Sequence, residues 1–151
     1  MPEVGQQAPD FILPSTHGEV SLRSLREGRR VVIAFYVDDF GPRCEQELRS
    51  FKDEHPRIQA LGADVVAIGG DSLESHSRFE KSLGGCPFPL ASDRGLKVAR
   101  LYDTAWQDGG QGIRAIYVVD EKGTIVHKIP GYDPADPAQL AQVFGALGTT
   151  H

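Results

Sequence analysis

The architecture of this 151-residue chain follows from Val31-Val32-Ile33-Ala34-Phe35-Tyr36 and the segment after it. The run is apolar or aromatic throughout and begins with β-branched residues, which is typical of a strand covered on both faces. A helical pattern follows from about Pro42 to Leu61, because apolar residues recur there at steps of three, four or seven. Pro42 suits a first helical turn. Pro56 does not suit a helix interior, and it predicts a kink because the apolar pattern resumes after it.

Strands and helices alternate along the rest of the chain. The predicted elements are a hairpin over Asp10 to Leu22, a strand at Asp64 to Gly69, a helix at Ser72 to Leu83, a short extended piece at Phe88 to Leu90, a helix at Gly95 to Tyr102, strands at Ala115 to Val119 and Thr124 to Ile129, and a last helix that Asp136 caps and Pro137 begins. Two β-α-β crossovers require parallel neighbours in one sheet, and the late hairpin adds antiparallel strands. We therefore predict a single α/β domain over residues 1–151. It has a thioredoxin-like layout, with a mixed central sheet, helices on both faces and an N-terminal β-hairpin.

Composition excludes several classes of function. Apolar residues make up 40% of the chain and charged residues 25%, as in globular proteins, and the net charge is −5. That acidic balance argues against nucleic acid or an anionic membrane as partner. No apolar run approaches a membrane span and no signal peptide is visible, so we expect a cytoplasmic protein.

No cofactor or metal is expected from the sequence. Two cysteines are too few for a disulfide scaffold or a four-thiolate zinc site, and the five histidines lack metal-ligand spacing. The glycine-rich stretch from Asp108 to Gly112 precedes a strand rather than a helix, so it predicts a loop and not a phosphate site. Trp106 beside it is expected to pack in the core.

Cys44 is the most informative residue. Its position after a buried strand, a loop and a helix-starting proline places the sulfur in the first turn of a helix, at the sheet edge where α/β proteins bind ligands. Free backbone N–H groups and the helix dipole lower a thiol pKa at that position. Four neighbouring acidic residues oppose this effect: Asp38, Asp39, Glu45 and Glu47. Arg43, Arg49 or an arginine from another strand must then outweigh them. The alternative is that Cys44 is a small apolar residue on the buried stripe.

Several blocks of sequence in the right order resemble the peroxiredoxins, and most closely their bacterioferritin-comigratory, or Q-type, subgroup. The blocks are Ala8 to Phe11, Phe35 to Leu48, Phe88 to Asp93 and Arg114 to Gly123. The resemblance runs from about Val4 to Leu147. It implies a thioredoxin-like fold and a thiol peroxidase that reduces hydrogen peroxide or organic hydroperoxides and is recycled by thioredoxin or a small thiol. It also implies a monomer or weak homodimer.

Matching the motif residue by residue assigns roles to three positions. Cys44 corresponds to the peroxidatic cysteine, Glu47 to the glutamate that makes active-site hydrogen bonds, and Arg114 to the arginine that stabilises the thiolate and the transition state. Two positions depart from the family pattern. Val37 stands where the family has proline, and Gly41 stands where it has the threonine whose hydroxyl holds the peroxide.

Cys86 is the other candidate redox residue. Relatives of the Q type often place a resolving cysteine five residues after the first, and here that position is Arg49. Cys86 follows Gly84 and Gly85, which would supply the mobility needed to reach a sulfenic acid. The alternative is an inert buried thiol, with resolution by an external thiol.

Two other functions fit the same residues. One is a redox sensor or thiol–disulfide exchanger that uses Cys44 and Cys86 with weak peroxidase activity, and Gly41 motivates it. The other is a non-catalytic thioredoxin-like interaction module, in which Cys44 would have an ordinary pKa near about 8.5.

Overall fold

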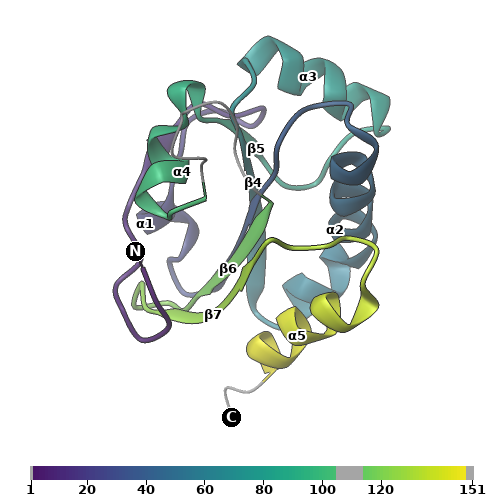
Figure 1. Ribbon diagram of the computed structural model, residues 1–151. Helices are drawn as coiled ribbons and strands as arrows, with labels where there is room; N and C mark the ends of the chain where they lie inside the picture. Colours follow the sequence, from purple (N-terminus) through teal and green to yellow (C-terminus); the bar gives the residue numbers. More distant parts are fainter. Residues whose placement is uncertain (1, 105–113, 149–151) are drawn as a thin grey trace.

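The predicted mixed sheet is present in the computed structural model, which describes residues 2–104 and 114–148 (Figure 1). Its five strands are β3 (Arg30–Phe35), β4 (Ala63–Gly69), β5 (Leu90–Ser92), β6 (Ala115–Val119) and β7 (Ile125–Pro130). They lie in the order β5-β4-β3-β6-β7. β3 pairs in parallel with β4, and β4 with β5, whereas β6 is antiparallel to both β3 and β7.

Helices cover both faces of this sheet. α2 (Pro42–Ala60), α3 (Leu73–Ser82) and α5 (Pro137–Gly148) cover one face. The short helices α1 (Leu22–Leu25) and α4 (Lys97–Leu101) cover the other, together with the N-terminal hairpin of β1 (Ile12–Leu13) and β2 (Val20–Ser21). The thioredoxin-like prediction is therefore confirmed in its layers and its strand directions.

The central strand β3 supplies side chains to both cores. Val32 and Ala34 pack toward α2, whereas Val31, Ile33 and Phe35 pack toward α4 and the N-terminal segment. All five are at most 2% exposed. Burying a large apolar side chain contributes about 1.5–3 kcal/mol, so this strand anchors the fold and holds the loop that follows it.

α2 continues past Pro56 rather than ending there, and Phe51 and Ile58 on either side are fully buried in the same core. Some local predictions differ from the structure. β5 begins at Leu90 rather than Phe88. The predicted helix from Gly95 is instead a 3₁₀ turn, η1 (Arg94–Leu96), followed by α4, since Gly95 and Leu96 both have positive φ. The sequence missed the one-turn helix α1. Trp106 and the loop at 108–112 lie outside the described residues.

The described residues contain neither a membrane-spanning helix nor a cluster of metal-binding side chains. Within residues 2–104 and 114–148, no helix has the length and hydropathy needed to cross a bilayer. The same residues contain no group of three or more His, Cys, Asp or Glu side chains placed to hold a metal ion.

Candidate active site

Cys44 is the third residue of α2, directly beyond the carboxyl end of β3. Gly41 precedes the helix as its N-cap residue, and its carbonyl accepts the N–H of Glu45 at 2.8 Å. Pro42 begins the helix, where its missing N–H removes no intrahelical hydrogen bond. The sulfur therefore lies where the sequence predicts it, in the first turn of a helix at the edge of the parallel strands.

The sulfur has two described polar contacts, both with the loop that leads into α2. The N–H of Val37 donates to Cys44 Sγ at 3.4 Å, and Asp38 Oδ1 accepts from the thiol at 3.8 Å. Cys44 itself is only 1% exposed. The thiol is thus held between a donor that favours the thiolate and a carboxylate that favours the thiol.

The thiol pKa shifts in the opposite direction from the sequence prediction. Burial raises the pKa of Cys44 most strongly, and the charges of Glu47 and Asp38 raise it further. Backbone hydrogen bonds from Asp38 and Val37 lower it, but they do not compensate. The expectation of an ionised sulfur at neutral pH is therefore wrong for this conformation, because a local helix-start argument omits the desolvation of a buried group.

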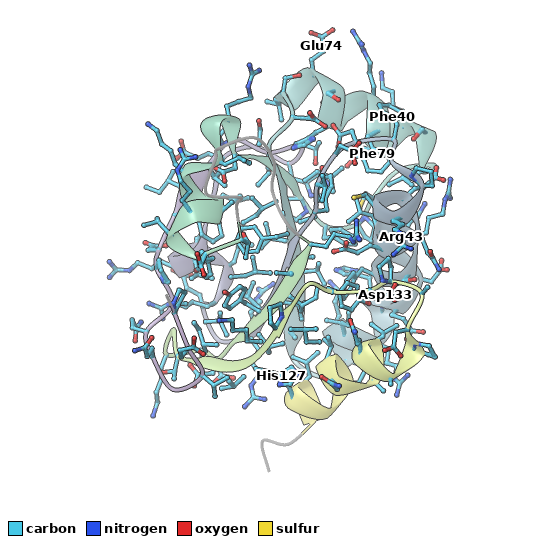
Figure 2. All side chains as sticks on the ribbon, in the orientation of Figure 1. Phe40, Arg43, Glu74, Phe79, His127 and Asp133 are labelled. Carbon is cyan, nitrogen blue, oxygen red and sulfur yellow. The ribbon has the colours of Figure 1, made fainter. Side chains whose placement is uncertain are left out.

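The arginines expected to offset the acidic neighbours make contacts elsewhere. Arg43 Nη1 lies 3.8 Å from Asp133 Oδ1, and Figure 2 shows this pair between α2 and the segment before α5. Arg49 Nη2 is shared between Glu45 and the carbonyl of Ser82, at 3.4 Å from each.

Arg114 lies beside Glu47 rather than against the sulfur. Its Nε donates to the carbonyl of Tyr132 at 3.3 Å, and its charge acts on the Glu47 carboxyl. Between Arg114 and Cys44 there is no hydrogen bond within the described part of the chain. The structure therefore brings Glu47 close to both residues but does not place the guanidinium on the thiol.

Glu47 is a buried carboxyl without a hydrogen-bond partner. It is 0% exposed, and neither carboxyl oxygen has a partner among the described residues. Burial raises its pKa well above the usual value, and Arg114 offsets only part of that rise. Burial therefore favours the protonated form of Glu47, whose O–H is a hydrogen-bond donor.

Comparisons with known proteins identify the family of this chain. A model of the AhpC/TSA family matches residues 4–128. Peroxiredoxin Bcp of Bacillus subtilis is 34% identical over 131 residues, which cover 82% of each chain. The chain belongs to the AhpC/TSA family, as a peroxiredoxin related to the Bcp group.

Two solved structures extend that likeness to the fold. Peroxidoxin BcpB of Mycobacterium tuberculosis superposes with a TM-score of 0.90 at 22% identity, covering 100% of this chain and 99% of its own. The bacterioferritin comigratory protein of Xanthomonas campestris gives 0.82 at 26% identity, covering 97% and 96%. Peroxiredoxins are thiol-dependent peroxidases, so this chain is an oxidoreductase of that class.

In this peroxiredoxin a buried polar network underlies the active-site loop. Asp39 Oδ2 lies 2.7 Å from His76 Nδ1 on α3 and accepts from the Ser75 hydroxyl at 2.7 Å. The Tyr36 hydroxyl donates to Asp39 Oδ1 at 2.8 Å. The other ring nitrogen of His76 faces two carbonyls, of Gly69 at 3.3 Å and Ala91 at 3.1 Å.

His76 lies at the centre of this network, with one ring nitrogen facing the Asp39 carboxylate and the other facing two backbone carbonyls. Burial acts to raise the pKa of Asp39, but the hydrogen bonds from His76 and Ser75 outweigh it and the pKa is lowered. The sequence missed this pair, because 37 positions separate the residues and no local spacing connects them. His76 is 0% exposed.

Phe40 lies at the surface of the same loop. Its φ is +65°, its side chain is 53% exposed, and its ring centroid lies 5.2 Å from that of Phe79 (Figure 2). A bulky residue in the left-handed region is strained, and the anchored residues Asp39 and Pro42 on either side hold it there.

Cys86 lies after α3 and remains a free thiol, as does Cys44. Burial raises its pKa to about 11, which the charge of Lys52 partly offsets. Lys52 is eight residues after Cys44 on α2, a separation of about 12 Å along the helix axis. A disulfide between the two cysteines would require their Cα atoms to lie within about 7 Å.

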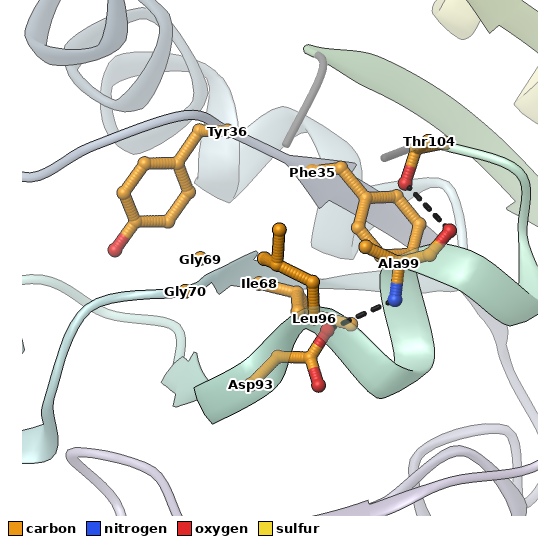
Figure 3. Close-up of a pocket in the computed structure, with 9 residues that line it drawn as sticks. All are labelled: Phe35, Tyr36, Ile68, Gly69, Gly70, Asp93, Leu96, Ala99 and Thr104. Carbon is orange, nitrogen blue, oxygen red and sulfur yellow. Dashed lines mark hydrogen bonds between the residues drawn. The ribbon is translucent and has the colours of Figure 1, made fainter. Parts of the chain in front are cut away.

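A small pocket lies on the opposite face of the sheet from Cys44 (Figure 3). Its volume is about 10 Å³, and its lining includes Phe35, Leu96 and Asp93. The Asp93 carboxylate is occupied in capping α4, since it accepts the N–H groups of Val98 and Ala99. The pocket has room for about one water and includes none of the candidate redox residues.

Proposed function

We propose that Cys44 is the peroxidatic residue and that it reduces hydrogen peroxide or organic hydroperoxides. The observation that carries this proposal is the position of Sγ in the first turn of α2, where it accepts the Val37 N–H, in a chain of the AhpC/TSA family. The name of the Xanthomonas campestris structure refers to alkyl peroxide reduction, which supports the same substrate class here.

In the proposed reaction the sulfur attacks one peroxide oxygen. An S–O bond forms, the O–O bond breaks, and Cys44 becomes a sulfenic acid while water or an alcohol leaves. The Val37 N–H donates to sulfur and stabilises the ionised form. Because burial keeps most of the population protonated, proton removal is part of the barrier in this conformation.

Glu47 and Arg114 are proposed to complete the site. Glu47 lies one helical turn after Cys44, and burial favours its protonated form, whose O–H can donate an active-site hydrogen bond. Arg114 supplies a positive charge close to Glu47 and is the proposed stabiliser of the thiolate and of the charge that develops on the leaving oxygen.

Stopped-flow consumption of hydrogen peroxide by the reduced protein tests the proposal. The wild type is expected to react far faster than free cysteine, and Cys44→Ser is expected to abolish the reaction, whereas Cys86→Ser leaves the first turnover intact. Consumption that survives in Cys44→Ser would refute the assignment.

Recycling is proposed to use Cys86 as resolving residue, with thioredoxin or a small thiol as the final reductant. Cys86 packs against the same core cluster that contains Cys44, which supports an internal partner. Mass spectrometry after one equivalent of peroxide should show a Cys44–Cys86 disulfide. A stable sulfenic acid with Cys86 free would instead assign resolution to an external thiol.

We infer that the protein acts in a cytoplasm, as a monomer or weak homodimer, with neither nucleic acid nor membrane as partner. Two free thiols suit a reducing compartment, and a net charge of −5 disfavours polyanionic partners. Light scattering during size-exclusion chromatography, across a range of concentrations, tests the oligomeric state.

A further inference from the structure

The carboxylate of Asp38 fills the space between Gly41 and the Cys44 sulfur. Asp38 Oδ1 lies 3.8 Å from Sγ, and a Cβ built on Gly41 would lie 2.5 Å from that same oxygen. The Asp38 Cγ would be 3.1 Å from this Cβ. Any side chain at position 41 therefore displaces the carboxylate, and glycine is the residue that lets it contact the thiol.

This carboxylate connects a buried sulfur with solvent. Asp38 is an exposed residue, whereas Cys44 is only 1% exposed. A thiol that is buried and protonated must pass its proton to a neighbour before or during attack on a peroxide. The group in contact with the S–H must therefore accept that proton or move away.

The other polar groups near the sulfur are unsuited to that task. Val37 presents an N–H, which is a donor. Neither carboxyl oxygen of Glu47 hydrogen-bonds the thiol or another described group, and the Tyr36 hydroxyl is engaged as a donor to Asp39. Arg114 carries the nearby positive charge but hydrogen-bonds the Tyr132 carbonyl. Asp38 is the carboxylate acceptor at the sulfur among the described residues.

We propose that Asp38 is a catalytic acid–base group of this peroxidase, which takes the thiol proton of Cys44 and returns it to the oxygen that leaves. The proposal rests on the peroxidatic role of Cys44 proposed above. The geometry that carries it is one carboxylate oxygen that touches both the reacting sulfur and the space left open by Gly41.

The step balances without another reactant. Asp38 removes the proton from the Cys44 thiol as sulfur bonds to the terminal oxygen of R–O–O–H. The O–O bond breaks, sulfur is oxidised by two electrons, and the peroxide is reduced by two. The leaving R–O⁻ takes the proton from the Asp38 carboxylic acid. The products are Cys44–S–O–H, R–OH and the regenerated carboxylate.

The test compares two oxidants that differ in their leaving group. Hydrogen peroxide expels hydroxide, a strong base that needs a proton, whereas peracetic acid expels acetate, a weak base that does not. Asp38→Asn keeps the shape of the side chain and removes the base. We expect it to slow the reaction with hydrogen peroxide by about 100-fold, and the reaction with peracetic acid by less than about 10-fold.

Two controls accompany this variant. Glu45→Gln removes one negative charge from the same helical turn without contacting the sulfur, and we expect both rates to stay within about twofold of the wild type. Alkylation of Cys44 by iodoacetamide, in a Cys86→Ser background, measures ionisation of and access to the sulfur. We expect Asp38→Asn to keep or increase that alkylation rate, because the carboxylate no longer opposes ionisation.

The remaining outcomes each overturn the proposal. Equal slowing with both oxidants would mean that Asp38 does not return a proton to the leaving oxygen, and parallel loss of alkylation would mean that it only shapes the site. Faster reaction with both would mean that it only suppresses ionisation, and unchanged rates would mean that it has no role. A wild type without rapid peroxide consumption would contradict the proposed function itself, which the Cys44→Ser comparison detects independently.

Discussion

At the scale of single residues, burial of ionisable side chains has the largest effect on the site, because it raises their pKa values. Burial raises the pKa of both Cys44 and Glu47, which disfavours the charged form of each. The proposed reaction then depends on groups that move protons and stabilise developing charge. Asp38 contacts the sulfur, and Arg114 is the positive charge that acts on Glu47.

The first prediction concerns Glu47. Because its folded-state pKa is raised, its contribution to stability is fully present below the unfolded value of about 4.3 and is lost as pH rises through the folded pKa. In that window the wild type is expected to lose unfolding free energy relative to Glu47→Gln, with a slope approaching about 1.4 kcal/mol per pH unit.

Urea unfolding at several values between pH 4.5 and 8 measures this difference. Asp53→Asn is a substitution at an exposed position of the same helix. It is expected to leave the pH dependence of the unfolding free energy as it is in the wild type. A constant difference between the wild type and Glu47→Gln across the range would show that Glu47 keeps an ordinary pKa.

At the scale of elements, α3 is tied to the active-site loop at its start and to α2 at its end. The ion pair between Asp39 and His76 links the loop to the first turns of α3. At the other end, Lys52 Nζ donates to the Leu83 carbonyl at 2.5 Å and Arg49 donates to the Ser82 carbonyl. Cations on the last carbonyls of a helix are favourable, so α2 caps the element that leads to Cys86.

The second prediction breaks the link at the start of α3. Asp39→Ala leaves the fully buried His76 ring without its carboxylate partner and is expected to lower the free energy of unfolding by about 3 kcal/mol at pH 7. Since the pKa of Asp39 is lowered on folding, its contribution is present above the unfolded pKa and is lost as pH falls through the folded one. Denaturant unfolding should therefore show the two proteins converging in acid. Asp53→Ala, at an exposed site, should cost less than about 0.5 kcal/mol.

The third prediction breaks the link at the end of α3. Lys52→Met keeps the apolar stem and removes the charged donor, which is expected to cost about 1–2 kcal/mol and to speed hydrogen exchange in the last turn of α3. Lys81→Met, at an exposed position in that same turn, is the matched control and should change exchange much less. Equal effects of the two substitutions would show that the contact with Leu83 contributes nothing.

At the scale of the whole molecule, the N-terminal segment is fastened to the far edge of the sheet. The N–H of Gly5 donates to the Ile125 carbonyl, and the N–H of Ala8 donates to the Gly123 carbonyl, each at 2.8 Å. Gly123 lies in the turn between β6 and β7 with a φ of +88°. The N-terminal segment thereby joins this turn, which closes the core on the face opposite Cys44.

The fourth prediction concerns that turn. A Cβ on Gly123 would meet the side chains of Gln7 and Arg26, whereas one on Gly131, also at positive φ, would meet nothing within 4 Å. Gly123→Ala is therefore expected to lower the free energy of unfolding by about 1–3 kcal/mol, and Gly131→Ala by about 1 kcal/mol from backbone strain alone. Thermal unfolding of both variants provides the comparison, and equal losses would argue against the packing contact.

Local sequence was enough for the layers and for the position of the sulfur. The apolar run at Val31 to Tyr36 and the helical spacing from Pro42 are patterns within short stretches of sequence. The structure forms the predicted strand and helix at these places. These patterns were sufficient to place Cys44 in the first turn of α2 at the edge of the sheet. The sequence blocks that resemble peroxiredoxins predicted the family, and the match of the AhpC/TSA family model over residues 4–128 confirms it.

Tertiary packing decided the chemistry of the site. The raised pKa of Cys44, the pairing of Asp39 with His76 and the charge of Arg114 acting on Glu47 all depend on groups from separate elements. Desolvation and Coulomb interactions act through space and depend on what surrounds a group after folding, whereas periodicity along the chain reports only which way a side chain faces. For that reason the sequence alone located the sulfur proposed to react, and the folded structure determined its proton and its neighbours.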